Sequence, residues 1–176
     1  SVSSTNLVLR DLAAKGAPEG TVVIAAHQTG GRGRKGRSFF TPEGTGVYIS
    51  LLLKPRIAPE DATLITTTAA VAICEAIESL CDRKAEIKWV NDVFMDGKKV
   101  CGILTEGSFD MESGQFEYAI LGAGINVFEP AGGFPAEIRE IAGSVLLSPA
   151  PDAKNRAIAD YLNRFLPLYR ALGSTA

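Results

Sequence analysis

The stretch VFMDGKKVCGILTE, residues 93–106, places the pair Asp96-Gly97 between two β-prone runs. An Asp-Gly pair between such runs is a strong signal for a two-residue hairpin turn, because that turn needs positive φ angles at both positions. A hairpin makes its two strands antiparallel neighbours. Residues 116–127, FEYAILGAGINV, follow the turn sequence DMESGQ and are expected to pair as the next strand. This part of the chain therefore excludes a doubly wound parallel sheet.

The rest of the chain adds strands and helices around this hairpin. Further strands are expected at 21–26, 47–53 and 85–90, and helices over 1–16, 58–80 and 151–172. Residues 131–150 are expected to be irregular, with room for one short helix. The pattern predicts an α+β (mixed α/β) domain, in which a largely antiparallel sheet is backed by helices.

Size and composition limit the function. A chain of 176 residues with 46% hydrophobic residues is long enough for one globular domain. A net charge of −2 argues against a general nucleic-acid binder. The three cysteines, Cys74, Cys81 and Cys101, lack CxxC spacing, which indicates reduced thiols in a cytoplasmic protein rather than disulfides or a zinc site. The sequence shows no signal peptide and no apolar run that predicts a membrane span.

The sequence GRGRKG, residues 31–36, and the Arg37 that follows form a basic loop. Its glycine spacing matches a dinucleotide fingerprint, but RSFFTPEGTG follows, and no helix begins there to meet a pyrophosphate. The loop also does not match the phosphate loop of nucleotide hydrolases, because no helix follows it and Arg37 stands where that motif needs a lysine. The loop could instead be a mobile lid that closes on an anion, because arginine offers paired hydrogen-bond donors that fit carboxylate and phosphate oxygens. A solvated surface loop and a minor-groove DNA hook remain open from composition alone.

Five blocks flank this loop in a fixed order: SSTN at 3–6, HQTGG at 27–31, KWVND at 88–92, KKVCGIL at 98–104 and GAGINV at 122–127. Together they resemble the catalytic domain of biotin protein ligases, from Ser3 to about Asn126 and more loosely to the final helix. The resemblance implies a mostly antiparallel sheet backed by helices. It also implies that biotin and ATP, with Mg²⁺, give biotinyl-AMP and pyrophosphate, and that a lysine of a biotin carboxyl carrier protein then accepts biotin.

The resemblance also assigns site residues. Lys99, Arg32 and Arg34 are the catalytic candidates. The biotin-binding candidates are Ser4, Thr5, Asn6, Gln28, Gly31, Arg32, Gly33, Arg34 and Lys99. The candidates for binding ATP or AMP are Arg34, Arg37, Phe39, Lys88, Trp89, Asn91, Gly124 and Asn126. The metal ligands stay unknown, with Asn91 or Asp92 as candidates, and His27 is interpreted as pocket wall.

Some features depart from the family pattern. Val90 stands where a proline is usual, and Phe39 where a tryptophan is common. We expect a single catalytic domain over 1–176, without the N-terminal helix-turn-helix domain or the C-terminal β-barrel of many relatives, and hence no DNA binding. Whether the chain forms a homodimer is left open. The alternatives are a lipoate or octanoyl ligase or transferase of the same fold, and a biotin or biotinyl-AMP sensor without transfer activity.

Overall fold

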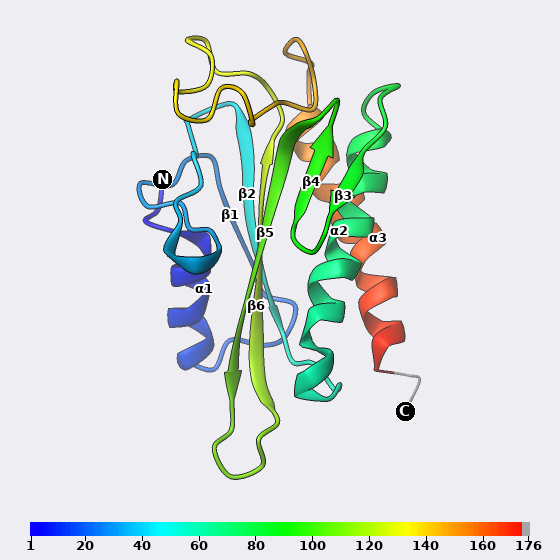
Figure 1. The fold of residues 1–176 in the computed structure, drawn as a ribbon. Coiled ribbons are helices and arrows are strands. Elements are labelled where there is room, and N and C mark those ends of the chain that lie inside the picture. The colour runs from blue at the N-terminus through cyan, green and yellow to red at the C-terminus, as the bar shows by residue number, and fades with distance from the viewer. Residues whose placement is uncertain (174–176) are drawn as a thin grey trace.

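The computed structural model describes residues 1–173, which form one antiparallel sheet with helices on both faces (Figure 1). The six strands lie in the order β1-β2-β6-β5-β4-β3. The strands are β1 (Val22–Ala25), β2 (Gly46–Leu53), β3 (Glu86–Lys88), β4 (Asp92–Met95), β5 (Lys98–Phe109) and β6 (Phe116–Asn126). The helices are α1 (Thr5–Ala14), α2 (Ala62–Glu78) and α3 (Ala153–Leu172), with short 3₁₀ turns at Arg34–Gly36 and Pro59–Asp61. The predicted α+β fold class is confirmed.

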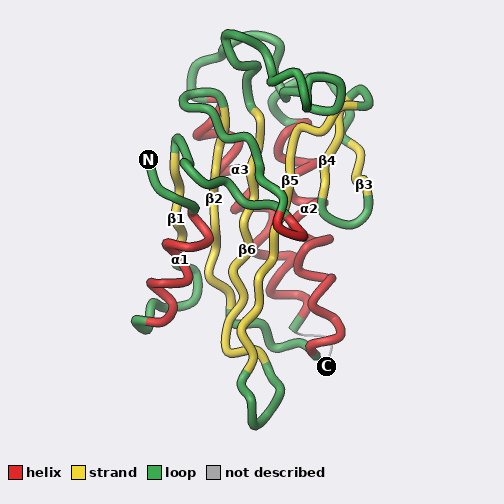
Figure 2. Tube along the Cα trace, turned by 60° about the vertical axis from the view of Figure 1, so that its left-hand side comes forward, coloured by secondary structure: helices red, strands yellow, loops and turns green. Residues whose placement is uncertain are grey.

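The predicted hairpin is present between β4 and β5. Asp96 and Gly97 have φ angles of 49° and 75°, and Met95 pairs with Lys98 across the turn. Strand β5 then pairs with β6 over most of its length. The far ends of β5 and β6 project beyond the rest of the sheet (Figure 2).

Both faces of the sheet are covered, which explains why the β2 sequence GVYISLLL is buried at every position. Ile49 and Leu51 face the large core formed with α2 and α3, whereas Leu52 packs with Leu9 of α1 on the opposite face. Successive side chains of a strand point to opposite faces. Ser50, the polar residue in this run, therefore lies on the α1 face with Leu52.

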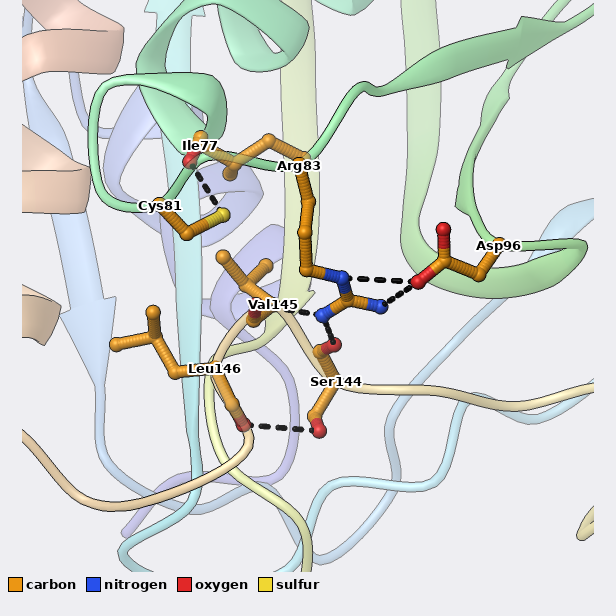
Figure 3. A network of polar contacts seen from close by, with 7 residues as sticks. All are labelled: Ile77, Cys81, Arg83, Asp96, Ser144, Val145 and Leu146. Atoms are coloured by element: carbon orange, nitrogen blue, oxygen red, sulfur yellow. Dashed lines mark hydrogen bonds and ion pairs between the residues drawn. The ribbon is translucent and has the colours of Figure 1, made fainter.

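Residues 131–150 are irregular, as expected, and contain turns rather than a short helix. Arg83 fixes this segment to the β4–β5 turn (Figure 3). Its Nε and Nη2 donate to Asp96 Oδ2 at 2.9 and 2.6 Å, and its Nη1 donates to the carbonyls of Ser144 and Val145 at 3.2 and 3.0 Å. One planar guanidinium thus joins three parts of the chain.

The cysteines lie in or beside the large core. All three are free, and Cys101 is fully buried. Burial raises the pKa of the Cys101 thiol, and also raises that of Cys74 to about 11. Both thiols are therefore protonated at neutral pH and are poor nucleophiles. Within residues 1–173, no helix combines the length and apolar character needed to cross a bilayer.

Candidate active site

A cavity of about 290 Å³ lies on the α1 face of the sheet, between the start of α1, the basic loop and strands β4 to β6. The loop crosses the front of the sheet in Figure 2. Most of the predicted site residues line this cavity. They are Ser4, Thr5, Asn6, Gln28, Arg32, Gly33, Arg34, Arg37, Phe39, Asn91, Lys99 and Gly124.

One end of the cavity is polar and is built around the first turn of α1. Ser4 occupies the N-cap position, but its side chain makes no capping hydrogen bond. Gln28 caps the helix instead, because its Oε1 accepts from the Thr5 backbone N–H at 2.8 Å and the Thr5 hydroxyl at 3.0 Å. The Ser4 hydroxyl is thus not used in capping. Because Oε1 faces Thr5, the donors that Gln28 can offer a ligand are those of Nε2.

Asn6 is buried beside this end and is held by protein groups on both sides of its amide. Its Oδ1 lies 2.6 Å from Ser50 Oγ, and its Nδ2 donates to Glu106 Oε2 at 2.7 Å. A Cβ on Gly122 would overlap Asn6 Oδ1, so only glycine lets Asn6 approach β6 this closely. Ser50 and Glu106 are not among the site residues predicted from the sequence. A serine inside an otherwise apolar strand was the signal that could have found Ser50.

Three of the cations that line the cavity have polar partners; two come from the basic loop and one from β5. Arg32 Nη1 lies 3.0 Å from Glu106 Oε1, and Lys99 Nζ lies 2.7 Å from Asp92 Oδ1. Arg34 Nη1 donates to Asn91 Oδ1 at 3.1 Å. The arrangement concentrates positive charge on one wall of the cavity in a protein that is slightly acidic overall.

Phe39 lies flat against the sheet at the foot of the loop. A Cβ on Gly124 would come within 2.6 Å of Phe39 Cε1, and one on Gly102 within 3.1 Å of Cε2. These two strand glycines make room for the ring. Lys99 Nζ lies 5.8 Å from the centre of the ring, within cation–π range.

Four predicted site residues do not line this cavity. Trp89 is 77% exposed, and Lys88 is exposed with its Nζ 5.0 Å from the centre of the Phe94 ring. Asn126 is buried, and its Nδ2 donates to the carbonyl of Gly143 at 3.1 Å. Gly31 lines a neighbouring cavity of about 440 Å³, to which His27 also contributes. The nucleotide roles of Lys88, Trp89 and Asn126, and the biotin role of Gly31, stay predictions.

The cavity also contains side-chain oxygen atoms that could serve as ligands of a magnesium ion. Asp92 and Asn91 both line it, and Mg²⁺ prefers carboxylate and amide oxygens. Among residues 1–173, no group of three or more His, Cys, Asp or Glu side chains forms a metal cluster. One carboxylate and one amide can supply part of the octahedral oxygen shell that Mg²⁺ requires, and the remaining ligands would come from water or a bound ligand.

Residues 1–126, which supply every residue that lines the cavity, match the biotin/lipoate A/B protein ligase family. The chain belongs to this family. The match ends where β6 ends.

Several members of the family are similar to this chain over most of its length. The bifunctional ligase/repressor BirA of Bacillus spizizenii is 42% identical over 82% of this chain. The biotin–[acetyl-CoA-carboxylase] ligase of Mycobacterium tuberculosis is 34% identical over 93% of this chain. The chain spans only 44% of the length of the former and 59% of the latter.

A solved structure agrees with the fold. The biotin protein ligase of Aquifex aeolicus, in complex with biotin and ATP, matches with a TM-score of 0.80 and 28% identity. The match covers 99% of this chain and 70% of that protein.

Proposed function

We propose that this chain activates biotin with ATP and transfers it to a lysine of a biotin carboxyl carrier protein. The observation that carries the proposal is the cavity itself, which has a polar end at α1 and is lined by five cations, four from the basic loop and Lys99 from β5. Biotin has the matching form, with a ureido ring at one end and a carboxylate at the other. The biotin ligase names of the relatives, and the biotin and ATP bound to the Aquifex aeolicus protein, support this choice.

The polar end supplies the recognition of biotin in this proposal. The ureido oxygen accepts hydrogen bonds, and the Ser4 hydroxyl and the Gln28 Nε2 group can donate them. A ligand without a ureido group would leave these groups unpaired, which costs about 1–3 kcal/mol for each group. This argument favours biotin over lipoate, whose dithiolane ring carries no such acceptor.

The cations serve the first reaction step. A biotin carboxylate oxygen attacks the α-phosphorus of ATP, a bond from phosphorus to carboxylate forms, and the bond to pyrophosphate breaks. Both reactants are anions, so fixed positive charge lowers the barrier. Lys99 and Arg32 stabilise the carboxylate and the α-phosphate, and Arg34 binds the phosphates. Asp92 and Asn91 would hold a magnesium ion that enters with ATP, and the ion would neutralise phosphate charge.

In the second step a neutral lysine amine of the carrier protein attacks the acyl carbon of biotinyl-AMP. The new amide forms and AMP leaves with its bonding electrons. The mixed anhydride hydrolyses readily in water, so a loop that covers it while the carrier docks protects the intermediate. The Mycobacterium tuberculosis relative is a biotin–[acetyl-CoA-carboxylase] ligase, which suggests an acetyl-CoA carboxylase subunit as the carrier.

Calorimetry with biotin and with lipoate tests the substrate. We expect lipoate to bind at least about tenfold more weakly, the loss from one unpaired polar group. Comparable affinities would place the chain on the lipoate side of the family.

A second assay follows AMP, pyrophosphate and labelled biotin with a purified carrier domain. Biotin-dependent pyrophosphate release followed by labelling of the carrier is expected. Release without labelling would indicate a sensor that makes or holds biotinyl-AMP and does not transfer it.

A further inference from the structure

Glu106, near the end of β5, contacts two segments of the site that both lie far from it in the sequence. Its Oε2 accepts a hydrogen bond from Asn6 Nδ2 at 2.7 Å, across 100 positions. Its Oε1 lies 3.0 Å from Arg32 Nη1, and Oε2 lies 3.3 Å from the same nitrogen, across 74 positions. One carboxylate therefore binds the start of α1 and the basic loop at the same time.

Both partners of Glu106 line the cavity, but Glu106 itself does not. It lies on the same face of β5 as Leu104, whose carbonyl also accepts from Asn6 Nδ2 at 3.4 Å. Any effect of Glu106 on a ligand in the cavity must therefore pass through Asn6 or Arg32.

We propose that Glu106 is a positioning residue, which holds the Arg32 guanidinium over the cavity and ties the basic loop to the biotin pocket. The proposal rests on the proposed function. Arg32 pairs with Ser38 in a short antiparallel bridge, so its backbone is held within the loop itself. The carboxylate of Glu106 ties this part of the loop to β5 and orients the guanidinium.

This contact differs from an ordinary surface ion pair. The side chains of Arg32 and Glu106 are 39% and 32% exposed, and such pairs alone contribute little. Here the carboxylate is also fixed by a charge-assisted hydrogen bond to Asn6, which is only 5% exposed. Asn6 in turn is held by Ser50, so the acceptor for Arg32 is oriented before the loop closes.

Glu106 could have the opposite role, as a competitor of the ligand's carboxylate for Arg32. The two roles differ in sign. A positioning carboxylate strengthens biotin binding, so its removal weakens affinity. A competing carboxylate weakens binding, so its removal tightens it.

The test compares Glu106→Gln with Glu117→Gln. A glutamine at 106 keeps an oxygen that can accept from Asn6 but loses the charge that attracts Arg32. Glu117 is an exposed residue of β6 that bonds Ser108 and touches neither Asn6 nor Arg32, so it is the matched control. In calorimetry we expect E106Q to weaken biotin binding about tenfold, the size of one lost bond to a charged group, and E117Q to leave it unchanged.

A double-mutant cycle with Arg32→Gln tests whether the effect passes through Arg32. In that background E106Q should weaken biotin binding by no more than about twofold, because the contact is already absent. Tighter biotin binding by E106Q, unchanged binding, or additive losses in the cycle would overturn the proposal.

A third readout needs no ligand. Trypsin should cut after Arg32 at least about threefold faster in E106Q than in E117Q at equal melting temperature, because the loop opens more often. Equal cleavage would overturn the proposal even if the wild-type chain binds no biotin. Absence of biotin binding by the wild type would refute the proposed function alone.

Discussion

Lys99 reaches the cavity from the β4–β5 hairpin, beside the carboxylate of Asp92 and the ring of Phe39. In the proposed first step it lies next to two anions that must meet, so its charge acts most strongly in the transition state. Lys99→Gln should slow formation of the adenylate by about 100-fold, the scale of one lost electrostatic donor. Biotin affinity should fall much less.

Single-turnover measurement of pyrophosphate release tests this prediction, with Lys98→Gln as the control. Lys98 is the neighbouring lysine, but its Nζ donates to the carbonyl of Arg139 rather than facing the cavity. An adenylation rate within a few-fold of wild type in K99Q would show that Lys99 is an ordinary surface lysine.

Tyr161 of α3 carries a hydroxyl that is fully buried and has no hydrogen-bond partner among the described residues. Burial raises the pKa of Tyr161, so the phenol stays neutral and its cost is that of an unpaired polar group. Tyr161→Phe should raise the free energy of unfolding by about 1 kcal/mol. Urea unfolding monitored by circular dichroism measures the change.

Tyr48→Phe is the matched control for this prediction. The Tyr48 hydroxyl donates to the carbonyl of Pro42 at 3.1 Å, and burial raises the pKa of Tyr48 to about 12. Removal of this hydroxyl should lower the free energy of unfolding by about 1 kcal/mol, because the Pro42 carbonyl loses its nearer donor and keeps only the longer bond from the Thr45 hydroxyl at 3.5 Å. Losses of equal size in both variants would mean that Tyr161 has a partner too.

At the residue scale, residues that line the cavity were easier to predict from the sequence than residues that only hold those lining residues in place. Ser4, Gln28 and Lys99 stand in recognisable blocks and line the cavity as expected. Glu106 and Ser50 contact Asn6 only because β5 and β2 bring them there. Contacts across 100 and 44 positions depend on strand register, which local sequence patterns do not encode.

The basic loop is the element whose behaviour matters most to the proposed chemistry. Its tip turns through Lys35 and Gly36, both with positive φ, and Gly33 N–H donates to the carbonyl of Arg37 at 2.7 Å. We expect the loop to open in the free protein and to close over biotinyl-AMP, because its crowded cations repel, Glu106 pairs with Arg32 alone among them, and an anionic ligand compensates the others. Fixing the backbone costs about 1–2 kcal/mol per residue, so the arginine–phosphate bonds must offset several kcal/mol.

Limited trypsin digestion measures this closure. Cleavage after Arg32, Arg34, Lys35 and Arg37 should be rapid in the free protein, partly suppressed by biotin and strongly suppressed by biotinyl-AMP. Lys84 provides an internal control, because its side chain is 89% exposed between α2 and β3. Equal rates of loop cleavage with and without the adenylate would show a solvated loop that takes no part in binding.

The elements themselves were predictable where one local signal was strong. The Asp96-Gly97 turn specifies the β4–β5 hairpin, and the apolar periodicity specifies α2 and α3. The strand order β1-β2-β6-β5-β4-β3 was not predicted beyond adjacent hairpins, since the pairing of β2 with β6 joins segments some 70 positions apart. Residues 131–150 gave no periodic signal, and long-range contacts such as those of Arg83 fix their course.

At the scale of the whole molecule, the segment after β6 supports the candidate site by pairing with the start of β5. Lys99 N–H donates to the carbonyl of Ile141 at 2.7 Å, and Gly143 N–H donates to the carbonyl of Lys99 at 2.9 Å. Arg83 holds the same segment through the carbonyls of Ser144 and Val145. The backbone of the catalytic candidate Lys99 is thus fixed by a segment that Arg83 holds in place.

Arg83→Lys should therefore reduce stability while it leaves ligand recognition largely intact. A lysine keeps the charge near Asp96 but cannot reach the carboxylate and two carbonyls together, because only the guanidinium offers a planar fork. Two buried carbonyls lose a donor, so the free energy of unfolding should fall by about 1–3 kcal/mol in urea titration.

Lys84→Ala is the control, because it removes a neighbouring exposed ion pair with Glu78 and should change stability by less than about 0.5 kcal/mol. Biotin affinity in R83K should stay within about threefold of wild type, since β4 still pairs with the Lys99 backbone. Undiminished stability in R83K would show that the turns of residues 131–150 hold themselves in place, and a large loss of biotin affinity would show that the support reaches the cavity directly.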